Sequence, residues 1–120
     1  MIDQRALKKA YKEARRPMGV FAVRNRTNGK VFLGGSQDLP GALNRHRFQL
    51  RMGSHQNRAL QADWNRLGEE AFEVEIMDEL KPKEGAPADP ARELAVLLEL
   101  WMEKLQPWAE RGYHQEPRST

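Results

Sequence analysis

The chain has 120 residues, which suits one domain, and its 39% of hydrophobic residues allow one modest core. It contains no cysteine, which excludes disulfides and thiolate metal sites. The net charge is +3, and no apolar stretch reaches the length of a signal peptide core or a membrane span. We therefore expect a cytoplasmic protein without membrane contact.

The first elements in chain order are a helix and a hairpin. Residues 1–17 carry apolar residues at helical spacing, strongly basic other faces and a terminal proline, which together predict a helix. Two short strand-like runs follow, residues 18–26 and 30–34, joined at Asn28-Gly29. This dipeptide favours a tight hairpin turn because both residues tolerate positive φ.

Capping residues predict two further helices. Ser36 or Asp38 can cap a helix that ends at Gly53, and Asn57 can open a helix that ends at Gly68. The buried side of the first of these helices is expected at Leu39, Leu43 and Leu50.

The second half of the chain predicts one strand and one helix. Phe72, Val74 and Ile76 alternate with other residues and indicate a half-buried strand with these three side chains inward. A helix should begin at Asp89-Pro90 and end before Pro107. Its apolar stripe comprises Leu94, Leu97, Leu98, Trp101, Met102 and Leu105.

This element order predicts an α+β fold, in which a small three-stranded antiparallel sheet is flanked by helices and preceded by an extra N-terminal helix. The expected organisation is a basic helix over 1–17, one domain over 18–114 and a flexible tail over 115–120. We find no internal repeat.

The hairpin carries a resemblance to a known family. Gly19-Val20-Phe21, a turn, and then Phe32-Leu33-Gly34 resemble the GIY-YIG nuclease domain of phage homing endonucleases and of the incision subunit of bacterial excision repair. Further landmarks are Ser36, Asp38, Leu39, His46, Gly53 to Asn57, Leu60-Gln61, Trp64-Asn65, Gly68, Trp101-Met102 and Gly112-Tyr113. The resemblance spans residues 18–114 and implies the same fold.

In that family two tyrosines, an arginine, a histidine and a metal-binding glutamate cut one phosphodiester strand. The metal ion neutralises the phosphate and the leaving oxygen, and the arginine stabilises the transition state. Here both tyrosine positions are phenylalanines, the arginine position is Ala42 and the glutamate position is Leu98. Only His46 remains of the polar set.

The candidate catalytic positions are Phe21, Phe32, Arg45, His46 and His114. Arg45 is considered a replacement for the missing arginine, and His114 occupies the third position of the family's closing Gly-Tyr-Asn. Glu99 is the candidate metal ligand, although it is rotated about 100° from Leu98 on a helix. Mg²⁺ or Mn²⁺ would be the cofactor if the chain cleaves. His55 can alternatively serve only to cap the next helix.

The charge distribution points to a polyanion as partner. Residues 1–66 contain 14 Lys/Arg and 4 Asp/Glu, a net charge of +10, whereas residues 67–120 contain 6 and 13, a net charge of −7. The expected nucleic-acid contacts are Lys8, Lys12, Arg15, Lys30, Arg45, Arg47, Arg51 and Arg58. The partner expected from the resemblance is DNA rather than RNA.

Three functions are compatible with these residues. The leading hypothesis is a nucleic-acid-binding protein of this family with absent or strongly reduced phosphodiesterase activity. The first alternative is an active metal-dependent endonuclease with a rearranged site that uses His46 and Glu99. The second is a protein-interaction module that uses the acidic half of the chain.

Overall fold

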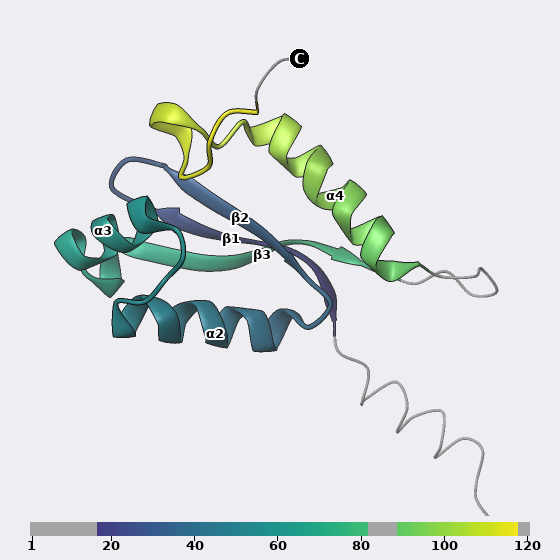
Figure 1. The fold of residues 1–120 in the computed structure, drawn as a ribbon, viewed down its shortest axis with the longest axis horizontal. Coiled ribbons are helices and arrows are strands. Elements are labelled where there is room, and N and C mark those ends of the chain that lie inside the picture. Colours follow the sequence, from purple (N-terminus) through teal and green to yellow (C-terminus); the bar gives the residue numbers. More distant parts are fainter. Residues whose placement is uncertain (1–16, 82–88, 118–120) are drawn as a thin grey trace, which may run out of the picture.

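The computed structural model describes residues 17–81 and 89–117 of the chain. This part contains strands β1 (Met18–Asn25), β2 (Val31–Ser36) and β3 (Phe72–Leu80), and helices α2 (Leu39–Met52), α3 (Arg58–Leu67) and α4 (Pro90–Leu105) (Figure 1). Short 3-10 turns lie at Glu69–Ala71 and Ala109–Arg111. Over the described residues this is the predicted order of elements.

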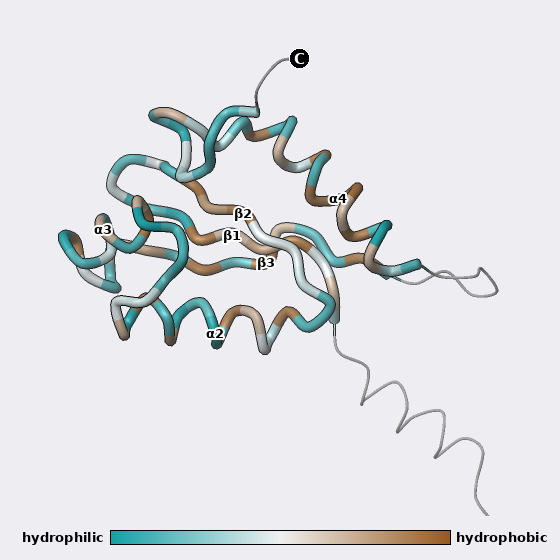
Figure 2. Tube along the Cα trace, viewed as in Figure 1, coloured by the Kyte–Doolittle hydropathy of each residue, from teal (hydrophilic) through white to brown (hydrophobic). Residues whose placement is uncertain are grey.

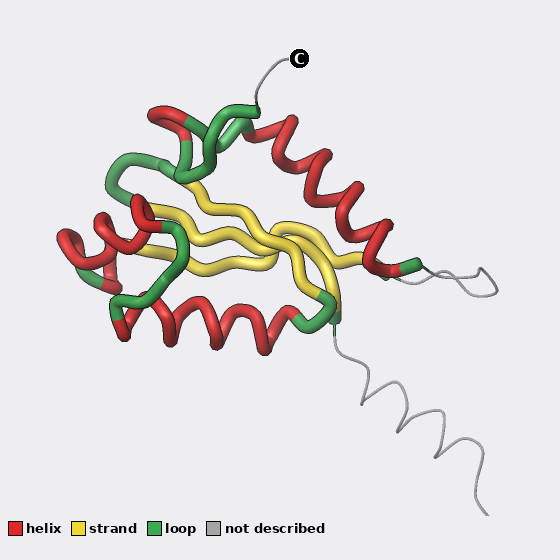
Figure 3. The backbone as a smooth tube through the Cα atoms, in the orientation of Figure 1, coloured by secondary structure: helices red, strands yellow, loops and turns green. Residues whose placement is uncertain are grey.

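The three strands form one antiparallel sheet in the order β2-β1-β3, which places β1 in the centre. Phe21 lies opposite Gly34 of β2 and Ile76 of β3. The predicted hairpin, the third strand and the α+β fold class are therefore confirmed (Figure 3).

The hairpin turn is wider than the predicted Asn-Gly turn. The amide of Asn25 donates to the carbonyl of Lys30, so four residues lie in the loop. Gly29 has a φ of +78°, but Asn28 has no positive φ. The Asn28 side chain instead accepts from the amide of Lys30 at 2.9 Å, and that of Asn25 accepts from the amide of Thr27 at 2.9 Å. These side-chain bonds stabilise the wider loop.

The helices begin and end where the sequence predicts. Asp38, Asn57 and Asp89 each accept a hydrogen bond from a backbone amide of the first helical turn. Gly53 has a φ of +76° and Gly68 a φ of +87°, values that glycine adopts without strain. Asp38, of the two residues considered, is thus the cap of α2.

Helices cover both faces of the sheet. α2 and α3 lie against one face and α4 against the other (Figure 1). The first face contains Val23, Leu50, Leu60, Trp64, Phe72 and Tyr113 in one cluster and Phe21, Leu39 and Ala42 in another. The second face contains Val20, Ala22, Val31 and Leu33, against the predicted apolar stripe of α4. Figure 2 shows hydrophobic residues along the strands and a hydrophilic loop between β1 and β2.

The inward pattern of two elements differs from the prediction. The register of β1 with β3 shifts between Val20 and Phe21, which leaves Met77 as an extra residue. This bulge turns Met77 toward the α4 cluster, whereas Ile76, predicted inward, is 49% exposed. On α2, the buried side includes Ala42, and Leu43 is only half-buried.

Several predicted features lie outside the described residues. These are the N-terminal helix with Lys8, Lys12 and Arg15, most of the loop before α4, and the last three residues of the tail. Among the helices that the structure describes, none has the length and hydrophobicity of a membrane span.

Candidate nucleic-acid and active site

The two motif phenylalanines lie on the face of the sheet that α2 covers. Their ring centroids are 6.4 Å apart, so the hairpin brings the two motif positions together. Phe21 is 1% exposed, and its ring occupies the space above Gly34, where a Cβ atom would lie 2.5 Å from the ring's Cζ. Gly34 is therefore required for the close approach of Phe21 to β2.

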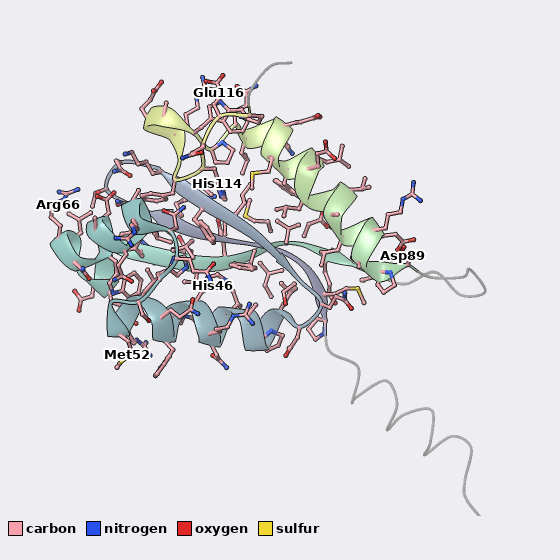
Figure 4. All side chains as sticks on the ribbon, in the orientation of Figure 1. His46, Met52, Arg66, Asp89, His114 and Glu116 are labelled. Atoms are coloured by element: carbon pink, nitrogen blue, oxygen red, sulfur yellow. The ribbon has the colours of Figure 1, made fainter. Side chains whose placement is uncertain are left out.

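Three histidines gather around these rings. His46, from α2, lies 4.9 Å from the centroid of Phe21 and 5.6 Å from that of Phe32. His55, from the loop between α2 and α3, meets Phe32 edge-on at 5.3 Å, and His114 stacks on Phe32 at 5.0 Å. Figure 4 shows His46 and His114 coming from opposite sides of β2. The fold thus assembles residues from positions 21 to 114 into one cluster.

A chain of hydrogen bonds fixes the proton positions in this cluster. The backbone amide of Asn57 donates to Nδ1 of His55 at 3.0 Å, so the proton of the neutral ring lies on Nε2. That Nε2 lies 2.8 Å from Nδ1 of His46, which must accept, so His46 carries its own proton on Nε2. His46 therefore presents an N–H donor, and its lone pair is occupied by His55.

His114 is held in a similar state from the other side. The amide of Leu33 donates to its Nε2 at 2.8 Å, which leaves the proton on Nδ1. The C-terminal segment sets this position: the amide of Tyr113 donates to the carbonyl of Val31, and the amide of His114 to that of Pro107. Backbone bonds to β2 thus align an imidazole beside Phe32.

All three imidazoles are neutral at pH 7. Burial, the neighbouring His55 and Arg45 lower the pKa of His46 to about 4. Burial also lowers the pKa of His55 and the pKa of His114. A neutral N–H can hold a phosphate oxygen, but it is a very weak acid and has no lone pair to act as a base.

The low pKa of His46 predicts a loss of stability in acid. In the unfolded chain this histidine binds its proton near the ordinary pKa of 6.5, whereas in the folded chain it does so only near 4. Its contribution to stability is therefore complete above pH 6.5 and is lost as the pH falls toward 4. Denaturant unfolding at pH 6.5 and pH 4 should show that the free energy of unfolding falls less in His46→Gln than in the unmodified protein, because glutamine does not titrate. An equal fall in both proteins would contradict the lowered pKa of His46.

A hollow of about 290 Å³ adjoins the cluster. Its lining is Phe32, His46, Gln49, His55, Gln56 and Asn57. A second, more open groove of about 540 Å³ shares His55 and Gln56 with it and continues to Arg58 and Asn65. The predicted site residue His46 thus lines the smaller of two hollows that share His55 and Gln56.

The described basic candidates fall into two groups. Arg45, Arg47 and Arg51 lie on α2, and Arg58 lies in the first turn of α3 beside the groove. Arg51 also pairs with Glu69. Lys30 lies apart, in the turn after β1, with its Nζ 5.8 Å from the centre of the Tyr113 ring. Arg45 and Arg47 thus flank His46 of the cluster in the sequence, and Arg58 lines the groove that His55 also lines.

The positions where the family has its metal-binding glutamate and its arginine hold the apolar residues Leu98 and Ala42. Leu98 is half-buried against Gly35 and the α4 cluster, whereas Glu99 lies on the exposed side of α4. Within residues 17–81 and 89–117, no group of three or more His, Asp or Glu is arranged to hold a metal ion. Ala42 is 2% exposed and packs with Phe21 and Leu39.

His55 was not among the predicted site residues. Its expected role as a cap is partly correct, because its Nδ1 bonds the amide of Asn57, the actual cap of α3. Its contact with His46 requires the turn between α2 and α3, which brings residues nine positions apart together. The Gly-Ser-His sequence after α2 was the feature of the sequence that could have indicated a turn bringing His55 toward His46.

The fold and the two motif strands define the class: this is a GIY-YIG-type α+β domain. No protein-family model matches the chain. A segment of 62 residues is 32% identical to intron-associated endonuclease 1 of Enterobacteria phage T4 and covers 52% of this chain and 25% of that protein.

Two solved structures share the fold. The catalytic domain of the homing endonuclease I-TevI superposes with a TM-score of 0.65 at 26% identity, covering 80% of this chain and 95% of that one. A mutant form of the same catalytic domain gives a TM-score of 0.62 at 24% identity, over 75% and 84%. The described domain is therefore a GIY-YIG domain, and it spans about a quarter of the phage protein that it matches.

Proposed function

We propose that this chain is a nucleic-acid-binding GIY-YIG domain whose phosphodiester cleavage is absent or strongly reduced. The similar proteins are endonucleases or their catalytic domains, which favours nucleic acid, and DNA first, as the partner. One observation carries the proposal: the rings beside His46 are those of Phe21 and Phe32, which have no hydroxyl to donate, accept or ionise.

The surrounding groups do not replace these hydroxyls. Tyr113 is the one tyrosine among the described residues, and it donates its hydroxyl to Asp63 and accepts from Asn25. Burial and the bond to Asp63 raise its pKa to about 12, so it cannot supply a phenolate at neutral pH. The lone pair of His46 is occupied by His55. The cluster is thus better suited to holding a phosphate than to activating a nucleophile.

A second candidate is a metal-dependent nuclease with a rearranged site. The gathering of His46, His55 and His114 around one ring favours it, since imidazoles are common catalytic groups. Glu99, the carboxylate considered for such a site, lies on the exposed side of α4. A Mg²⁺ or Mn²⁺ ion would have to find oxygen ligands elsewhere.

The test measures binding and cleavage on the same DNA duplex. We expect affinity to fall with salt, with a slope of about −0.9 for each phosphate contact, and to see no nicking in a Mg²⁺ and Mn²⁺ series. Replacing Arg47 and Arg51 together by alanine should make the slope shallower, whereas Arg92→Ala, at an exposed position on α4 over the other face of the sheet, should not change it. Salt-independent binding would contradict the basic surface, and metal-dependent nicking lost in His46→Ala would support the second candidate.

A further inference from the structure

The outward side of α2 exposes two large apolar side chains. Phe48 is 62% exposed and Met52 is 66% exposed. They are four residues apart, so they are neighbours on one helix face. In Figure 4 the side chain of Met52 points away from the sheet at the end of α2. Neither side chain is therefore part of the hydrophobic core, and packing within the domain does not explain why these positions are apolar.

This apolar pair lies within a basic helix. Arg45 and Arg51 stand three residues to either side of Phe48, and α2 contains no Asp or Glu. Arg51 pairs with Glu69, but both side chains are at least half exposed, and exposed pairs of this kind contribute little and can exchange partners. The face thus combines an accessible aromatic ring with two cations.

We propose that this face binds single-stranded nucleic acid, with an unpaired base stacked on Phe48 and phosphates at Arg45 and Arg51. The inference rests on the proposed function and adds the strand state of the partner. Aromatic rings on a positively charged surface are the common means of holding single strands, because every base has a face that can stack. In a paired duplex those base faces are covered by their neighbours.

The charge of the face argues against a second copy of the chain as its occupant. Two such faces in contact would bring Arg45 and Arg51 of one copy against the same arginines of the other. Like charges across an interface are strongly unfavourable. A polyanion supplies the complementary charge instead.

The groove gives a strand on this face a path to the histidine cluster. Its first lining residues, Gly53 and Ser54, directly follow Met52, and its lining includes Arg58 and His55. His55 in turn contacts His46. A strand stacked on Phe48 and continuing past Met52 would therefore run toward the site described above.

The test uses a labelled oligothymidylate and a fully paired duplex of the same length. Phe48→Ala should weaken binding of the oligothymidylate by about five- to a hundredfold, while Phe48→Tyr retains it and Phe48→Leu loses it like alanine. Leu100→Ala, at an exposed leucine of α4, is the matched control and should change nothing. The salt slope should stay the same in Phe48→Ala and become shallower by about 0.7 in Arg45→Ala.

Each contrary result has a separate meaning. Equal affinity for both probes, with no effect of Phe48→Ala but a clear effect of Arg45→Ala, would overturn this inference and leave the proposed function standing. Failure to bind either probe would overturn the proposed function. Full affinity in Phe48→Leu would exclude base stacking. A concentration-dependent dimer dispersed by Phe48→Ala would identify the face as an interface between copies.

Discussion

Replacing Tyr113 with alanine is expected to lower the free energy of unfolding by about 3–5 kcal/mol. The ring is 7% exposed and belongs to the cluster with Val23, Leu60 and Trp64. Removing it leaves a cavity between β1 and α3 as well as losing the apolar burial. Since small domains have about 5–15 kcal/mol in total, this change should bring the protein close to unfolding.

The hydroxyl and the ring of Tyr113 can be separated by a second variant. The hydroxyl donates to the Asp63 carboxylate at 2.9 Å and accepts from the side-chain amide of Asn25 at 3.0 Å. Asn25 is fully buried. Tyr113→Phe leaves that amide without its acceptor and should cost about 1–3 kcal/mol. Both variants can be measured by denaturant unfolding, provided that the dependence of the free energy of unfolding on denaturant concentration stays the same. If Tyr113→Phe leaves the free energy of unfolding unchanged, water replaces the hydroxyl.

This residue also links stability to the candidate site. Gly112 pairs with Val31 along the outer edge of β2, and His114 follows directly after the anchored tyrosine. Loosening the segment should therefore free the imidazole of His114 from the amide of Leu33. Its pKa, lowered by burial, should then rise toward 6.5, which proton NMR titration of Tyr113→Phe can follow.

The elements were predictable where neighbours in sequence determine them. Caps at Asn57 and Asp89 and the stops at Gly53 and Gly68 depend on backbone amides within the same turn. The bulge at Met77 was not predictable, because it depends on how β3 pairs with a strand more than 50 positions earlier.

In the candidate site, too, the features set by neighbours in sequence were predictable and those set by tertiary contacts were not. The nearness of Phe21 and Phe32 follows from the hairpin, and the resemblance supplies His46. The role of His55 depends on a tertiary contact and on a hydrogen bond that fixes a proton, and neither is written in local sequence. Charge counts likewise could not show that Arg51 pairs with Glu69 from the acidic half.

Restoring the missing groups is expected to create nuclease activity. The combined Phe21→Tyr, Phe32→Tyr, Ala42→Arg and Leu98→Glu variant should nick DNA with Mg²⁺ or Mn²⁺ at least about a hundredfold faster than the unmodified chain. One well-placed transition-state donor is typically worth on the order of a hundred- to a thousandfold in rate. Because groups that act as a unit do not contribute independently, the single changes should do far less.

The structure indicates where the restored groups would act and what they would disturb. An arginine at position 42 starts beside Phe21, and a glutamate at position 98 starts against Gly35. Both positions contact apolar residues, so unfolding must be measured in parallel and the assay run well below the melting temperature. The same variant with His46→Ala is the control, since its activity should fall back. Equal nicking by the unmodified chain, or a folded variant that does not cut, would show that the lost hydroxyls, cation and carboxylate are not what separates this domain from a nuclease.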